Sequence, residues 1–149
     1  MEGYSWTLRV CRAEPGQANV FTRQHRFLVG APVSFDKADK AISALEYVLG
    51  AIGADLVNGL QARARKRRIS IAQIEAVVEG ELNNPLIYLG VVGETGHPGL
   101  GRVRVQVSLA SSEAEATMQH LWQEMLATSP LVHTLQASIQ LDLSLRVMA

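Results

Sequence analysis

Apolar and polar positions along the chain change period several times. Strict alternation over residues 102–109 predicts a strand with Val103, Val105, Val107 and Leu109 facing inward. Less regular alternation predicts further strands over 4–13, 19–29, 69–82 and 138–147, and short ones over 33–35 and 86–92. Residues 43–67 are apolar over most of their length, and 111–128 carry an apolar stripe at helical spacing, so both segments are predicted helices. Ser43 and Glu46 have the spacing of a capping box at the start of the first helix, and Ser111 or Ser112 is expected to cap the second. A short helical turn is expected after Ser129 and Pro130.

Strands and helices follow one another in blocks, which favours an α+β fold with mostly antiparallel sheets. A chain of 149 residues is expected to form a single domain spanning 1–149. The helix over 43–67 is apolar on nearly every face and is expected to be surrounded by protein. Its glycines at 50, 53 and 59 each lower helix propensity by about 1 kcal/mol relative to Ala, which predicts close approach by another backbone. Burial between two sheets, with a second subunit contributing, would satisfy both features.

Asp55 stands near the middle of this apolar helix, and no other charge lies between Glu46 and Arg63. At helical spacing it shares a face with Ile52 and Gly59. A carboxylate buried there without a partner would cost several kcal/mol or take up a proton. The sequence therefore predicts a cation, a set of hydrogen-bond donors or a solvent-filled pocket beside Asp55.

The formal net charge of +0 gives the chain no overall attraction for nucleic acid or an anionic membrane, and neither is expected as a partner. A basic run over 63–68 is either a local patch for nucleic acid or another anion or, the interpretation we favour, a set of cations that offset the dipole at a helix C-terminus. The single cysteine, Cys11, excludes a disulfide within the chain and favours a reducing compartment. The start of the sequence lacks the apolar core of a signal peptide, so a cytoplasmic protein is expected.

Metal and phosphate sites are not predicted. The four histidines show no metal-ligand spacing, and there is neither an HExxH motif nor a cysteine pair. The glycine-rich loop over 93–101 lacks the Lys-Ser/Thr that holds phosphates and magnesium in a phosphate-binding loop. We therefore expect no metal and no cofactor.

Several motifs in order resemble the OsmC/Ohr family of osmotically inducible and organic hydroperoxide resistance proteins. They are SALEYVLGAIGADLVNGL with the basic run after it, IAQIEAVVEGEL, RVRVQVSL and finally SPLVHTL. The resemblance covers most of the chain from about residue 26 onward. It implies an intertwined homodimer in which two long central helices lie between sheets and a pocket forms at the subunit interface.

The resemblance also implies where the chemistry of the family would be altered. The peroxidatic cysteine of the family falls on Asp55 and its resolving cysteine on Ser129. Neither a carboxylate nor a hydroxyl can follow the sulfenic-acid and disulfide route of a thiol peroxidase. The peroxidase branch also uses a glutamate near the start of the helix and an arginine from the N-terminal strands. Glu46 lies near the former position, and Arg23 or Arg26 corresponds to the latter.

Three hypotheses follow for the candidate site, whose members are Asp55, Ser129, His133, Glu46, Arg23 and Arg26. The first is a homodimer without thiol peroxidase activity that binds a small, largely apolar molecule with a polar head. The second is a structural or regulatory interaction protein in which a buried Asp55 is neutralised and does no chemistry. The third is a hydrolase that uses Asp55, Ser129 and His133 in the manner of a Ser-His-Asp triad.

Overall fold

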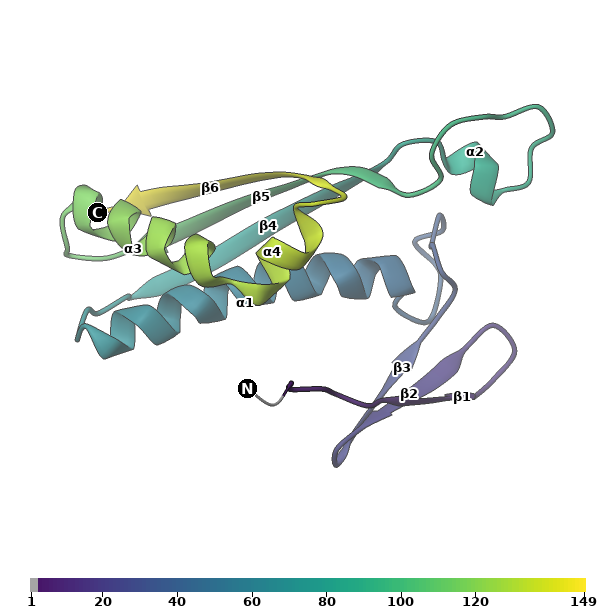
Figure 1. The fold of residues 1–149 in the computed structure, drawn as a ribbon, viewed down its shortest axis with the longest axis horizontal. Coiled ribbons are helices and arrows are strands. Elements are labelled where there is room, and N and C mark those ends of the chain that lie inside the picture. The colour runs from purple at the N-terminus through teal and green to yellow at the C-terminus, as the bar shows by residue number, and fades with distance from the viewer. Residues whose placement is uncertain (1–2) are drawn as a thin grey trace. The chain divides into compact units, whose positions relative to one another are not determined.

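The computed structural model describes residues 3–149, and the chain divides into two compact units, Met1–Val48 and Leu49–Ala149. Each unit contains a three-stranded sheet, and one long helix starts in the first unit and continues through the second (Figure 1). The predicted α+β class with mostly antiparallel sheets and a long helix is confirmed. A single domain over 1–149 stays a prediction, as does the dimer.

The first unit is a meander of three antiparallel strands: β1 (Arg9–Arg12), β2 (Ala18–Thr22) and β3 (His25–Val29). The prediction of one strand over 19–29 is wrong, because the chain reverses between Thr22 and His25. Arg23 adopts a positive φ of 53° in this turn, a conformation that residues other than glycine rarely adopt. No glycine or proline marks the turn in the sequence. The strand predicted over 4–13 is shorter than expected, and 33–35 form no strand.

The long helix α1 (Ala44–Lys66) begins with the capping box that the sequence predicts. The backbone N–H of Glu46 donates to Oγ of Ser43 at 3.1 Å, and the N–H of Ser43 donates to Oε1 of Glu46 at 3.0 Å. This reciprocal pair satisfies donors that the first helical turn leaves open. The hydrogen bond that the backbone N–H of Ser43 donates to the Glu46 carboxylate is the main cause that lowers the pKa of Glu46. At the C-terminal end of α1, the basic run places Arg63, Arg65 and Lys66 in the last turn.

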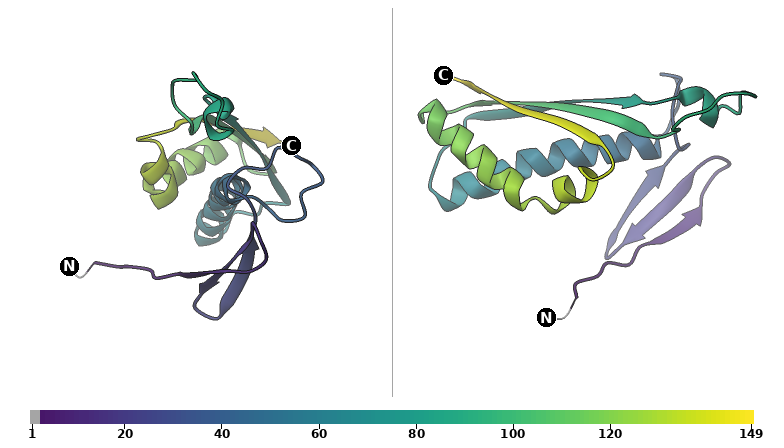
Figure 2. Two further views of the ribbon diagram at one scale, coloured as in Figure 1. Left: turned by 90° about the vertical axis from the view of Figure 1, so that its right-hand side faces the viewer. Right: turned by 45° about the horizontal axis from the view of Figure 1, so that its top comes forward.

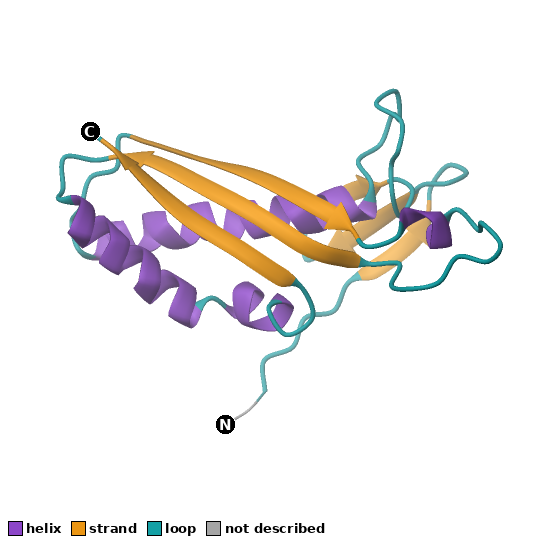
Figure 3. Cartoon of the chain, turned by 90° about the horizontal axis from the view of Figure 1, so that it is seen from above, coloured by secondary structure: helices purple, strands orange, loops and turns teal. Residues whose placement is uncertain are grey.

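The second unit contains β4 (Gln73–Leu82), β5 (Leu100–Ala110) and β6 (Gln140–Met148), with β5 in the centre (Figure 3). β4 pairs antiparallel with β5, whereas β6 pairs parallel to it. The parallel pairing follows from the crossover that joins β5 to β6 through α3 (Glu115–Thr128) and α4 (Pro130–Leu135). Figure 2 shows α3 on the same side of this sheet as α1.

The core of the second unit lies between the sheet and these helices. The inward face of β5 is buried as predicted, and the apolar stripe of α3 covers it. On α1 a stripe at helical spacing is buried, whereas Ala51 and Ala54 on its opposite side are exposed. The buried side chains of these three elements include Val103, Val105, Val107, Leu109, Met118, Leu121, Trp122, Met125, Ile52, Leu56 and Leu60. The expectation that protein surrounds α1 on all sides depends on a second subunit and stays a prediction.

Two local predictions in the second unit are wrong. Residues 86–92 do not extend the sheet, because Asn84 caps a short helix, α2 (Pro85–Tyr88), by accepting from the N–H of Leu86 at 3.1 Å. Proline at the first helical position suits a helix start and lacks the N–H that a strand needs. Neither Ser111 nor Ser112 caps α3. Its N-cap is Ala114, which makes no side-chain hydrogen bond.

The glycines of α1 differ in what lies opposite them. A methyl group at Gly53 would lie 2.8 Å from Cγ2 of Val78 on β4, and one at Gly59 would lie 2.9 Å from Cγ of Met125 on α3. At Gly50 no atom would lie within 4 Å. Close approach is therefore real at Gly53 and Gly59, although side chains and not a backbone make it.

This difference predicts opposite effects for two matched substitutions. Gly50→Ala should raise the free energy of unfolding by about 1 kcal/mol, because alanine is the better helix former and the space is open. Gly53→Ala should forfeit that gain, because displacing Val78 costs about 1–3 kcal/mol. Urea unfolding of both variants measures the difference, and equal stabilities would show that β4 does not press on Gly53.

Candidate functional site

Asp55 points from α1 toward the junction between α3 and α4. Its side chain is half-buried, and its Oδ2 accepts a hydrogen bond from Oγ of Ser129 at 2.6 Å. The two residues are 74 positions apart in sequence. A hydroxyl that donates to a carboxylate forms one of the stronger hydrogen bonds in proteins. Of the partners that the sequence leaves open for Asp55, the structure supplies a hydrogen-bond donor, Ser129, and no described residue forms a salt bridge with this carboxylate.

Ser129 is held in place by its own role in the backbone. It ends α3 and is the N-cap of α4, with an extended conformation at φ −72° and ψ 117°. Its Oγ accepts from the N–H of Val132 at 3.1 Å while donating to Asp55. Pro130 follows at the first position of α4, where no helical hydrogen bond requires the backbone N–H that proline lacks. Ser129 is only 6% exposed, and its hydroxyl has a partner both as donor and as acceptor.

A pocket of about 230 Å³ opens beside this pair, entirely within the second unit. One wall is a stripe of α1 at helical spacing, and the other is the end of α3 with the α4 junction. Gly59 lies in the middle of the first wall, where its missing side chain leaves room for Met125. The lining residues are Asp55, Gly59, Ala62, Arg63, Lys66, Met125, Thr128, Ser129 and Pro130.

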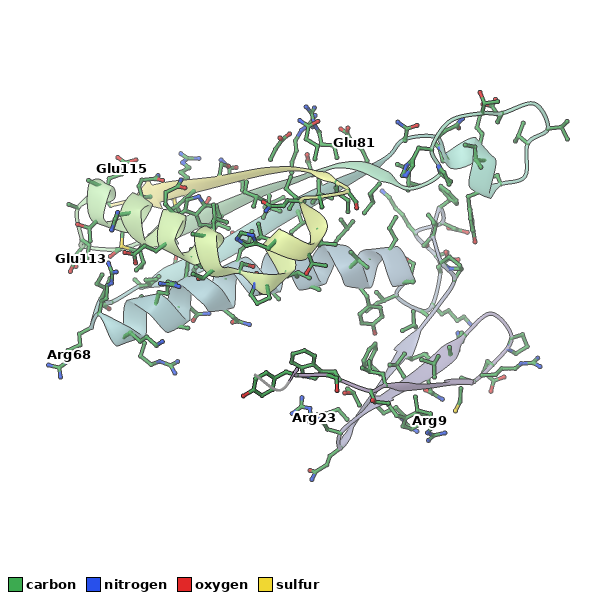
Figure 4. All side chains as sticks on the ribbon, viewed as in Figure 1. Arg9, Arg23, Arg68, Glu81, Glu113 and Glu115 are labelled. Atoms are coloured by element: carbon green, nitrogen blue, oxygen red, sulfur yellow. The ribbon has the colours of Figure 1, made fainter. Side chains whose placement is uncertain are left out.

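The far end of the pocket is basic. Arg63 donates to Oγ1 of Thr128 and lies 3.7 Å from Oε2 of Glu124, and Arg67 forms a close ion pair with the same carboxylate. The hydrogen bond from Arg67 lowers the pKa of Glu124. These contacts tie the end of α1 to α3. Arg68, by contrast, adopts a positive φ of 57° just beyond α1 and extends away from the helix (Figure 4).

His133 does not complete a triad. Its Nε2 lies 2.9 Å from the carbonyl oxygen of Ala127, and its Nδ1 lies 3.3 Å from Nε2 of Gln136. The ring is exposed, and no described hydrogen bond joins it to Ser129 or Asp55. The hydrolase hypothesis requires Ser129 to reach Asp55 or His133, and the first contact is present. The imidazole that would accept the serine proton in a triad is bonded elsewhere.

The other three predicted site residues belong to the first unit. Glu46 is occupied by the capping box, and about two and a half helical turns separate it from Asp55 along α1. Arg23 lies in the turn between β2 and β3 (Figure 4), and Arg26 on β3 pairs with Phe21 on β2. The structure therefore brings together Asp55 and Ser129 from the predicted set, and places the other members in separate local settings.

The single cysteine also lies in the first unit. Nη1 of Arg9 donates to Sγ of Cys11 at 2.8 Å, and the same guanidinium stacks over the ring of Phe21 at 4.4 Å from its centroid. The shared strand face of Arg9 and Cys11 was visible in the sequence. Cys11 lies neither in α1 nor at the α3–α4 junction.

Sequence reasoning missed the basic wall of the pocket. Arg63 and Lys66 are eight and eleven residues beyond Asp55, so helical spacing puts all three on one face of α1. The helical spacing from Asp55 is the signal that could have identified this wall, whereas the interpretation favoured from the sequence is dipole compensation. Among the described residues no group of three or more potential ligands is placed to hold a metal ion, and no helix is long and apolar enough to cross a bilayer.

Solved structures share this fold at low sequence identity. An OsmC-like protein from Mycoplasma pneumoniae superposes with a TM-score of 0.80 at 14% identity, covering 99% of this chain and 100% of the other. A putative osmotic stress induced and detoxification response protein from Psychrobacter arcticus gives 0.71 at 15% identity, covering 98% of each chain. OsmC, an organic hydroperoxide resistance protein from Legionella pneumophila, gives 0.70 at 11% identity, covering 98% and 99%.

These likenesses establish the fold. Among curated proteins no sequence matches the chain. The family model described as OsmC-like protein matches residues 37–144, which include α1, the whole second sheet up to Ser144, and both Asp55 and Ser129. That match covers well over half of the chain and agrees with the fold. The chain therefore belongs to the OsmC-like family.

Proposed function

We propose that this protein binds a small, largely apolar molecule with a polar head in the pocket beside Asp55, and that it does not act as a thiol peroxidase. The observation that carries the proposal is the Asp55–Ser129 hydrogen bond at the edge of an open pocket. A homodimer is part of the proposal, as the family resemblance implies. The organic hydroperoxide resistance named for the Legionella relative is a property of that protein.

The absence of thiol chemistry follows from the residues at the two aligned positions. In the family resemblance Asp55 and Ser129 replace a reactive and a resolving cysteine, and their side chains are in direct contact. Such contact is what a pair of cysteines would need in order to form a disulfide. A carboxylate and a hydroxyl have no oxidation states that a peroxide and a dithiol could cycle.

An oxygen of Asp55 that accepts no hydrogen bond from the described residues supports ligand binding. Oδ2 of Asp55 accepts from Ser129, whereas Oδ1 has no hydrogen-bond partner among the described residues, and Asp55 as a whole is half-buried. Such an oxygen accepts readily from a hydroxyl or amine. Gly59, Ala62, Met125 and Pro130 supply apolar surface for the rest of the molecule. Small-molecule sites typically combine an apolar lining with a few placed polar groups.

A structural role for the same pair makes a different claim. The Asp55–Ser129 bond joins α1 to the α3–α4 junction, and it gives the Ser129 hydroxyl and one oxygen of Asp55 a partner without any ligand. If this is its whole purpose, the pocket should be indifferent to small molecules. Binding experiments on the pocket therefore separate the two functions.

Peroxidase assays test the loss of thiol chemistry. With cumene hydroperoxide and dithiothreitol, the purified protein should consume peroxide at the rate of the reagents alone, because Asp55 and Ser129 cannot turn over. Cys11→Ser should behave identically to the unchanged protein. Robust consumption that Cys11→Ser abolishes would contradict this part of the proposal.

Titration with 1-hexanol tests the pocket. Nitrogen-15 NMR should show saturable shifts of amides lining the pocket, with a dissociation constant in the millimolar range expected for so small a ligand. Ala62→Phe fills the pocket and should abolish these shifts, whereas Gln61→Phe, on an exposed neighbouring position of α1 outside the pocket, should leave them unchanged. Shifts that survive Ala62→Phe, or no shifts in the unchanged protein, would overturn the binding proposal.

A double-mutant cycle measures what the polar pair contributes to stability. Asp55→Ala and Ser129→Ala should be coupled by about 1.5–3 kcal/mol in the free energy of unfolding, as for hydrogen bonds to charged groups. Ser129→Ala alone should cost about 1 kcal/mol more than Asp55→Ala, because it also removes the N-cap of α4. Thr128→Ala is the matched control and should be additive with Asp55→Ala. Additivity in both cycles would show that the bond contributes nothing in solution.

A further inference from the structure

The two ends of the pocket carry opposite charges. Asp55 and Ser129 form one end, and Lys66 lines the other, eleven residues further along the same face of α1. That spacing corresponds to a rise of about 16 Å between the two backbone positions. The flexible four-carbon stem of lysine allows its ammonium group to reach back along the helix toward the pocket.

Lys66 differs from the other cation in the pocket. Arg63 donates to Thr128 and lies 3.7 Å from Glu124, a carboxylate that it shares with Arg67. No ion pair or hydrogen bond engages Lys66 within the part of the chain that the structure describes. An ammonium group without a counter-charge at the end of a pocket complements a ligand anion.

The pocket groups that have no partner among the described residues, the Lys66 ammonium and one oxygen of Asp55, restrict the chemical class of the ligand. One unpaired cation matches a monoanion such as a carboxylate better than a doubly charged phosphate. The open oxygen of Asp55 accepts a hydrogen bond and repels anions, so the opposite end of the ligand must be a donor such as a hydroxyl or an amine. The volume of about 230 Å³ lies below the range of about 300–1,000 Å³ typical of sites for drug-sized ligands.

We propose that the ligand of this pocket is a short hydroxy or amino carboxylic acid, with its donor group on Asp55 and its carboxylate on Lys66. This inference rests on the proposed function, since it assigns a chemical class to the occupant of the same pocket. Between the two ends, Gly59, Ala62 and Met125 contact the aliphatic chain of the ligand. Ser129 holds the Asp55 carboxylate in position to receive the donor.

The experiment compares two probes that differ in a single end group, 6-hydroxyhexanoate and 1-hexanol, by NMR titration at low salt. The hydroxy acid should bind the unchanged protein at least about fivefold more tightly, because a charge-assisted contact with Lys66 is added. Lys66→Gln should remove this preference, so that the variant binds the two probes with equal affinity. Arg65→Gln is the matched control, since it removes an equal charge from the adjacent position outside the pocket.

The outcomes separate the two proposals. If both probes bind equally to the unchanged protein, or if Arg65→Gln weakens the hydroxy acid as much as Lys66→Gln does, the assignment of a carboxylate site at Lys66 is overturned and the pocket itself stands. If neither probe causes saturable shifts, both the carboxylate assignment and the proposed binding function are overturned. A preference that Lys66→Gln alone abolishes supports both.

Discussion

The hydrogen bond from Ser129 to Asp55 is the contact on which the arrangement of the candidate site depends. A hydrogen-bond donor stabilises a half-buried carboxylate on an apolar helix, because an unpartnered charge is costly away from water. The donor comes from a segment 74 residues further along the chain. The fold must therefore bring the α3–α4 junction against the middle of α1, and the N-cap of α4 determines where the hydroxyl points.

Packing around this bond leaves a pocket at that point. Met125 occupies the room that Gly59 leaves on α1, so the two helices approach closely on one side of the Asp55–Ser129 pair. Beyond it, the ion pairs of Arg63 and Arg67 with Glu124 hold the end of α1 against α3. The Asp55–Ser129 hydrogen bond and the ion pairs of Glu124 therefore join the helices at two places. The pocket lies between them and carries a carboxylate at one end and cations at the other.

Membership of the OsmC-like family describes the fold more closely than the chemistry. Sequence identities of 11–15% to the solved relatives accompany TM-scores of 0.70–0.80. Folds persist when the reactive groups placed on them change, because packing depends on size and apolarity more than on the identity of a single polar side chain. The family resemblance implies that Asp55 and Ser129, which are joined by a hydrogen bond here, stand where relatives carry two cysteines, and this implication is part of the proposed function.

Local patterns in the sequence were sufficient where local physics decides the structure. The alternation in β5, the apolar stripe of α3 and the capping box at Ser43 each involve near neighbours, and all three were predictable. The hairpin turn at Arg23 and the short helix at Pro85 were missed, because an unusual backbone angle and an asparagine cap override the apolar pattern there.

The sequence by itself determined that Asp55 needs a partner, since one charge in an apolar helix is visible without coordinates. It also contained the spacing that aligns Asp55 with Arg63 and Lys66 on one helical face. Only the tertiary structure decided that the partner is Ser129, that His133 turns to the Ala127 carbonyl instead, and that a pocket remains. The reason is physical: helical periodicity is a short-range property, whereas contacts across 74 residues depend on how the whole crossover from β5 to β6 packs onto the sheet.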